Sequence, residues 1–150
     1  MRITNILPLA ALALLVGCGF NLSRGNVPAK LNLLEQKFGV KWPTRYENAY
    51  GGSLTDDRGG SVILVRMEIT KSDYLAWRQS ATNILHDAGF ATPPPEDPKL
   101  ERYFPWWDCS SVPSVQGRLF DNEIQSAKGL LFVYAVPTNN NVTMYIDGTP

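Results

Sequence analysis

The clearest pattern of hydrophobic positions in the chain is an alternation over residues 61–70. One set of alternate side chains is apolar throughout, whereas the other set becomes charged at Arg66 and Glu68. Successive side chains of a strand point to opposite faces of a sheet, so a period of two indicates a strand with one buried face. The sequence therefore predicts a strand over residues 61–70.

Residues 27–38 show the spacing of a helix, because their leucines and Phe38 recur at intervals of about three or four positions. Pro28 stands near the start of this segment and Gly39 stands just past its end, which is the usual placement of these residues at helix termini. We expect an amphipathic helix that docks on the core.

A second helix is predicted from Thr70 or Ser72 to Ala88. Either hydroxyl can cap the first turn, and Gly89 can end the helix. His86 is the single histidine of the chain and falls off the apolar face of this helix, so we expect it at the surface. The apolar face comprises Tyr74, Trp77, Ala81, Ile84, Leu85 and Ala88.

Three further strands are predicted near the C-terminus, over residues 114–120, 129–136 and 142–147, with a tight connection at 137–141. Consecutive strands with short connections favour antiparallel pairing. The order of elements predicts an α+β fold, with a single small antiparallel sheet of about four strands and two helices packed on one face.

The remaining segments predict irregular structure. We expect residues 40–50 to cross the molecule without regular structure, because Pro43 favours an extended Trp42. Residues 51–60 contain two Gly-Gly pairs and predict a loop. Residues 91–98 contain four prolines and predict a stiff surface connector.

The N-terminal segment has the layout of an export signal. Arg2 precedes an apolar run over residues 6–16, which is shorter than the about 20 residues that a membrane span requires. The sequence Leu-Val-Gly-Cys at residues 15–18 resembles the bacterial lipobox. This resemblance implies cleavage after Gly17 and attachment of lipid to Cys18, where several acyl chains hold a protein more firmly than one.

The lipobox resemblance also predicts a location. Gly19 occupies the position at which an Asp would imply retention in the inner membrane of enterobacteria, so we expect the outer membrane, facing the periplasm. Residues 19–27 are polar and predict a tether that extends at most about 30 Å. The predicted organisation is a signal at 1–17, a lipidated Cys18 with its tether at 18–27, and one domain at 28–150.

Composition and charge limit the classes of partner. Removal of the signal takes away Arg2 and leaves 13 cations against 14 anions, a net charge of −1. This balance does not favour nucleic acid, and the chain has no lysine-rich segment for anionic lipids. We expect the membrane as a partner only through the lipid anchor.

Cys109 is the second cysteine of the chain. Lipidation occupies the other one, so no disulfide can form within the molecule. In an oxidising compartment the Cys109 thiol is expected either to be buried or to pair with another molecule. A catalytic thiol would need a histidine base, and nothing in the sequence links His86 to Cys109.

The chain contains no sequence motif specific for a reaction, a metal or a cofactor. The acidic pairs at 56–57 and 96–97 lack the regular spacing of a calcium loop. Asp108, Asp121 and Glu123 could supply paired carboxylates for glycan hydrolysis, because such pairs are defined in space. We therefore predict no cofactor and keep a peptidoglycan-acting hydrolase as a lesser alternative.

The densest aromatic segment is Tyr-Phe-Pro-Trp-Trp at residues 103–107. Aromatic residues dominate binding hot spots because they bury a large area at low entropic cost. Tyr103, Phe104, Trp106 and Trp107 are therefore the candidate partner-binding residues. The alternative is that both tryptophans fill the core.

Two resemblances concern the mature chain. Residues 31–52, with Leu-Asn-Leu-Leu-Glu-Gln-Lys-Phe-Gly-Val-Lys-Trp-Pro and a later Tyr-Gly-Gly, are similar to the opening of SUKH-type immunity domains, although Trp42 stands where that family prefers Leu. The region from Val40 to Ile146 resembles uncharacterised small lipoproteins of Gram-negative bacteria, which implies no activity.

The sequence favours a membrane-anchored periplasmic lipoprotein that binds a protein and is not an enzyme. Such binding could serve inhibition, immunity or exclusion, which require only a surface and a location. The alternative is a structural accessory subunit of an envelope assembly.

Overall fold

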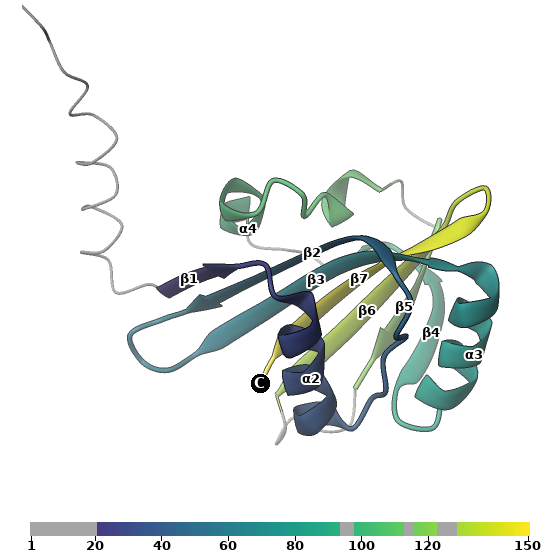
Figure 1. Ribbon diagram of the computed structural model, residues 1–150, viewed down its shortest axis with the longest axis horizontal. Helices are drawn as coiled ribbons and strands as arrows, with labels where there is room; N and C mark the ends of the chain where they lie inside the picture. The colour runs from purple at the N-terminus through teal and green to yellow at the C-terminus, as the bar shows by residue number, and fades with distance from the viewer. Residues whose placement is uncertain (1–20, 94–97, 113–115, 123–128) are drawn as a thin grey trace, which may run out of the picture.

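The computed structural model describes residues 21–93, 98–112, 116–122 and 129–150. In this part of the chain, seven strands form one antiparallel sheet with the order β1-β2-β3-β7-β6-β5-β4 (Figure 1). The strands are β1 (Asn21–Arg24), β2 (Glu47–Thr55), β3 (Ser61–Thr70), β4 (His86–Ala91), β5 (Gly117–Asp121), β6 (Leu130–Pro137) and β7 (Asn141–Thr149). The helices are α2 (Val27–Phe38), α3 (Lys71–Ala81), α4 (Pro98–Tyr103) and a short 3-10 helix, η1 (Cys109–Ser111).

The sheet consists of two antiparallel meanders that meet at its centre. One meander is β1-β2-β3 and the other is β4-β5-β6-β7, and they are joined by the pairing of β3 with β7. This pairing runs from Ile63 opposite Gly148 to Thr70 opposite Asn141. The three strands at the centre of the sheet, β3, β7 and β6, contribute most of its buried side chains.

The first face of the sheet is covered by α2 and α3 (Figure 1). Helix α2 begins at the cap Asn26, whose side chain accepts from Ala29 N, and ends at Gly39, which has a φ of 79°. Trp42 follows α2 and stacks on Trp77 of α3, with ring centroids 6.2 Å apart. The apolar positions of β3, β6 and β7 complete this core.

The second face of the sheet is covered by α4 and the segment that follows it (Figure 1). Phe104, Trp107 and Cys109 are buried there against Leu64, Tyr134 and Tyr145 of the central strands. A strand in the middle of this sheet therefore buries both of its faces.

The predicted fold class was wrong in two respects. The sheet has seven strands instead of about four, and the three helices lie on both faces of the sheet instead of one. The additional strands are β1, β2 and β4. Residues 21–24 were assigned to a tether, yet they pair with β2 at the sheet edge.

Strand β2 occupies the segments for which we predicted an irregular crossing and a loop. Its glycines serve close packing: a Cβ at Gly52 would lie 2.4 Å from Cε1 of the Phe104 ring. The turn of the hairpin is confined to the residues between β2 and β3, where Asp56 Oδ1 accepts from Arg58 N and Gly60 N. Gly52 therefore marks contact with an aromatic ring, whereas Gly59 and Gly60 lie in the turn, as the predicted loop implied.

Helix α3 is shorter than predicted. It begins after the cap Thr70, as expected, but ends at Ala81, and β4 starts at His86. Asp87 of β4 accepts hydrogen bonds from Arg78 and Arg118, which hold the strand against α3 and β5. Gly89 does not end a helix; it has a φ of 77° at an irregularity in the β4–β5 pairing.

Several predictions are confirmed. The helix at 27–38 and the strand at 61–70 have the predicted bounds, and the two last strands lie within about two residues of theirs.

Cys18, Glu96, Asp97 and Glu123 lie outside the described residues, as do parts of the predicted connector and of the strand at 114–120. No helix in the described residues is long and apolar enough to cross a membrane.

Candidate functional site

The structure divides the four predicted partner-binding residues into two pairs. Phe104 and Trp107 are fully buried in the second core, whereas Tyr103 and Trp106 are half-buried at its edge. The chain turns tightly after α4, where Trp107 N donates to the Phe104 carbonyl at 2.8 Å. Both sequence interpretations therefore apply: Trp107 fills the core, and Trp106 lies at the surface.

Trp106 stacks on Tyr50 of β2, with ring centroids 5.9 Å apart and an interplanar angle of 19°. Tyr50 is 44% exposed. Beneath the stack, Trp106 contacts Phe104 at 5.5 Å and Trp107 at 6.0 Å between centroids. The buried rings therefore hold the two outer rings in one orientation.

Arg66 of β3 adjoins this stack. Its guanidinium carbon lies 5.9 Å from the Tyr50 ring centroid and 5.7 Å from that of Tyr145, within range of a cation–π contact. Its Nε lies 3.4 Å from Oδ1 of Asp108, and Nη2 lies 3.9 Å from Glu68. The arginine is thus fixed between two rings and two carboxylates.

Tyr145 anchors the carboxylate of Asp108. The Tyr145 hydroxyl donates to Asp108 Oδ1 at 2.7 Å. Burial raises the pKa of Tyr145 above its ordinary value, and the neighbouring carboxylate Asp108 raises it further. The hydroxyl therefore stays protonated at neutral pH and keeps donating.

We call the surface formed by Tyr50, Arg66, Trp106 and Asp108 the aromatic patch. It combines two exposed or half-buried rings with an oriented arginine, the residue types that concentrate binding energy at protein interfaces. Sequence reasoning found Trp106 but missed Tyr50 and Arg66 as members. Their signal lay in the pairing of Tyr50 with Arg66 across β2 and β3, which the predicted irregular crossing at residues 40–50 concealed.

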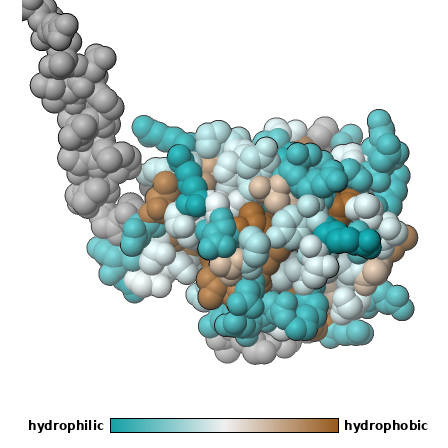
Figure 2. All heavy atoms as spheres, viewed as in Figure 1, coloured by the Kyte–Doolittle hydropathy of each residue, from teal (hydrophilic) through white to brown (hydrophobic). Residues whose placement is uncertain are grey.

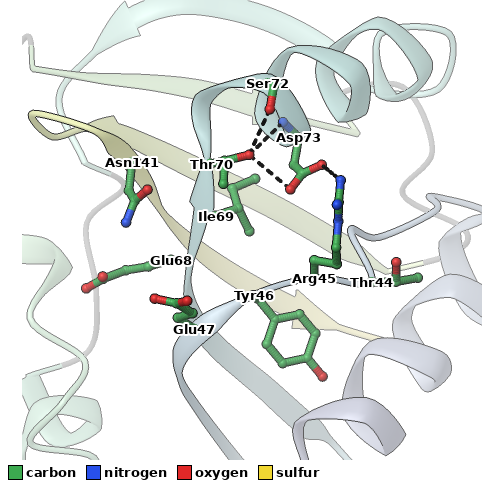
Figure 3. Close-up of a pocket in the computed structure, with 10 residues that line it drawn as sticks. All are labelled: Thr44, Arg45, Tyr46, Glu47, Glu68, Ile69, Thr70, Ser72, Asp73 and Asn141. Atoms are coloured by element: carbon green, nitrogen blue, oxygen red, sulfur yellow. Dashed lines mark hydrogen bonds and ion pairs between the residues drawn. The ribbon is translucent and has the colours of Figure 1, made fainter.

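A polar depression of about 510 Å³ borders the aromatic patch at Glu68 (Figure 3). On one side of it, Arg45 Nη2 donates to Asp73 Oδ1 at 2.8 Å, and Thr70 Oγ1 donates to the other carboxylate oxygen. These hydrogen bonds, first that of Thr70 and then that of Arg45, hold the pKa of Asp73 below its ordinary value. Arg45 and Thr70 thereby hold the Asp73 carboxylate in the first turn of α3.

The other side of the polar depression carries two opposed carboxylates. Glu47 and Glu68 are cross-strand partners on β2 and β3, and Asn48 Nδ2 donates to Glu68 Oε2 at 3.0 Å. Like charges that face each other across a sheet favour a cation between or above them. The aromatic patch is therefore flanked by negative charge on the side of the polar depression.

The residues considered for catalysis do not share one site among the described residues. Asp108 belongs to the aromatic patch, whereas Asp121 lies on β5 opposite His86, whose Nδ1 is 3.7 Å from Asp121 Oδ1. His86 is on edge strand β4 and half of its side chain is exposed, as its surface placement predicted. No group of three or more potential metal ligands occurs in the part of the chain that the structure describes.

Comparisons of the chain with models of protein families, with curated proteins and with solved structures each find no match.

Proposed function

We propose that this protein is a lipid-anchored domain of the Gram-negative periplasm that binds another protein through the aromatic patch. The observation that carries the proposal is the stack of Tyr50 on Trp106, which presents exposed ring surface in a fixed orientation. Rings that are already ordered lose little conformational entropy on binding, so more of the contact energy contributes to affinity.

The charges around the aromatic patch indicate the chemistry of the partner. Arg66 is already paired with Asp108 and lies near Glu68, so it does not offer an uncompensated positive charge. Glu47 and Glu68 add negative charge beside the rings. A complementary surface would place an apolar or aromatic side chain on Tyr50 and a lysine or arginine beside the two glutamates.

Affinity capture with the lipidated chain from native envelope and secretome extracts tests this proposal. We expect one stoichiometric protein partner, lost in both Tyr50→Ala and Trp106→Ala. Leu75→Ala is the matched control, because Leu75 is 59% exposed on α3 and lies away from the second face. Circular dichroism establishes that each variant folds. Partner binding that survives both aromatic substitutions contradicts the assignment of the patch.

The anchor has a separate test. We expect Cys18→Ser to abolish metabolic lipid labelling and to release the protein from membranes, because this thiol is the acceptor that the lipobox resemblance implies. Lipid labelling that persists in the variant contradicts the anchor. The binding proposal is tested separately, by the affinity capture.

A further inference from the structure

An apolar row crosses one end of the second face of the sheet. The strand registers place Leu22 of β1 opposite Leu54 of β2, and Leu54 opposite Val62 of β3. One residue beyond the last β3–β7 pair, Thr149 continues the line, and it lies opposite Leu130 of β6. Five adjacent strands thus contribute one side chain each, four apolar ones and the polar Thr149, over a length of about 19 Å at the usual strand spacing.

This apolar row is only partly covered. Leu22 is 40% exposed and Leu130 is 51% exposed, whereas Leu54 and Val62 are half-buried. The segment that covers the second face packs farther along the strands, where the ring of Phe104 lies over Gly52. Figure 2 shows brown hydrophobic atoms at the surface near the place where β1 begins, and further brown groups elsewhere on this face.

The anchor would lie next to the apolar row. Strand β1 begins at Asn21, only three residues after Cys18, so their Cα atoms can be at most about 11 Å apart. Asn21 is the residue before Leu22 and pairs with Thr55. An anchored Cys18 therefore holds this end of the sheet at the bilayer surface, in place of a long tether that would let the domain move away.

We propose that the apolar row is a membrane-contact surface, which lies in the interfacial region of the bilayer that carries the lipid anchor. This inference rests on the lipidation of Cys18. The nearby hairpin turn carries Asp56, Asp57 and Arg58, so attraction to anionic lipid does not dominate and the contact is mainly apolar.

This orientation also places the aromatic patch. Tyr50 lies four residues along β2 from Leu54, a distance of about 13 Å at the usual rise of a strand. The apolar row and Tyr50 are on the same face of the sheet. The protein would therefore present its aromatic patch a short distance above the lipid headgroups, to a partner that is itself near the membrane.

A fluorescent label at Leu130 tests the proposal. Tethering alone brings Leu22 near lipid. Leu130 lies on β6, four strands away from β1, and only the proposed orientation brings it near lipid as well. We would label Leu130→Cys in the full lipidated chain with an environment-sensitive fluorophore. The chain is reconstituted in vesicles of phosphatidylethanolamine and phosphatidylglycerol, with or without bromine on the acyl chains. Leu75→Cys is the control, and the unsubstituted chain measures background labelling of Cys109, which is 1% exposed.

We expect a blue shift of the Leu130 label on reconstitution and a loss of its intensity with brominated lipid, neither of which occurs at Leu75. Equal responses at both positions overturn the proposal. A blue shift without bromine quenching also overturns it, because it indicates contact with a second protein copy. Flotation of the same samples separates the causes: a chain that does not float lacks the anchor, whereas one that floats without quenching has another orientation.

Discussion

Asp147 carries a carboxyl group in an apolar part of the sheet, and its removal should stabilise the protein. Its cross-strand neighbours are Leu64 of β3 and Phe132 of β6. Burial raises the pKa of Asp147 from 3.8 to about 6, and burial is the sole cause of the change. At neutral pH the folded protein must therefore hold a carboxylate that no cation or hydrogen-bond donor among the described residues stabilises.

The size of this cost follows from the two pKa values. A rise from 3.8 to about 6 corresponds to about 3 kcal/mol, and partial solvent screening reduces it to about 2 kcal/mol. The folded state binds the proton of Asp147 more tightly than the unfolded chain does. The protonated carboxyl therefore makes its full contribution to the free energy of unfolding below the unfolded pKa. This contribution is lost as the pH rises through the folded pKa.

The assay is urea unfolding of the wild type and of Asp147→Asn at several pH values. We expect the two free energies of unfolding to agree near pH 4 and the variant to be more stable by about 2 kcal/mol near pH 7. Asp87→Asn is the control of opposite sign. Burial alone would raise the pKa of Asp87, but hydrogen bonds from Arg118, Gly89 and Arg78 outweigh it and lower the pKa, so this variant should be destabilised. An Asp147→Asn variant that is less stable at neutral pH would refute the reasoning.

Three further predictions concern the second core. Trp107→Ala should cost about 3–5 kcal/mol in urea unfolding, and Trp106→Ala clearly less, because only Trp107 is fully buried; equal losses would contradict this placement. Gly52→Ala should cost about 1–3 kcal/mol, since its methyl group displaces Phe104, and an unchanged midpoint would argue against that contact. Cys109 should react with a thiol reagent only after denaturation, whereas rapid reaction of the folded protein would show that it is accessible.

The elements that were predictable from sequence are those with a complete local pattern. Strand β3 alternates over its whole length, and α2 has its apolar face, a proline at its start and a glycine at its end. Each of these signals arises within the element itself. The bounds of both elements therefore followed from the sequence.

The strands that were missed depend on distant parts of the chain. Gly51 and Gly52 resemble a turn locally, and only the ring of Phe104, about fifty residues later, explains a glycine within a strand. Strand β4 was hidden because Ile84, Leu85 and Ala88 continue the helical spacing of α3. There the bonds of Asp87 to Arg78 and Arg118 favour a strand over a longer helix.

The candidate site was half predictable for the same reason. Adjacent tryptophans in one segment identified an aromatic cluster, but the sequence did not show which ring faces the core. Tyr50 and Arg66 join Trp106 only through the register of β2 with β3. A surface that is assembled across strands requires that register, which hydrophobic periodicity alone does not supply.

Photochemical crosslinking in living cells tests the central claim most directly. Tyr50 is replaced by a photoreactive benzophenone amino acid in the full-length chain, with Leu75 replaced in the same way as the control. Because Tyr50 is exposed on the aromatic patch, we predict one discrete crosslinked protein at Tyr50 and none at Leu75. Crosslinks that are absent at Tyr50, or that are the same at both positions, would contradict a protein-binding role for the aromatic patch.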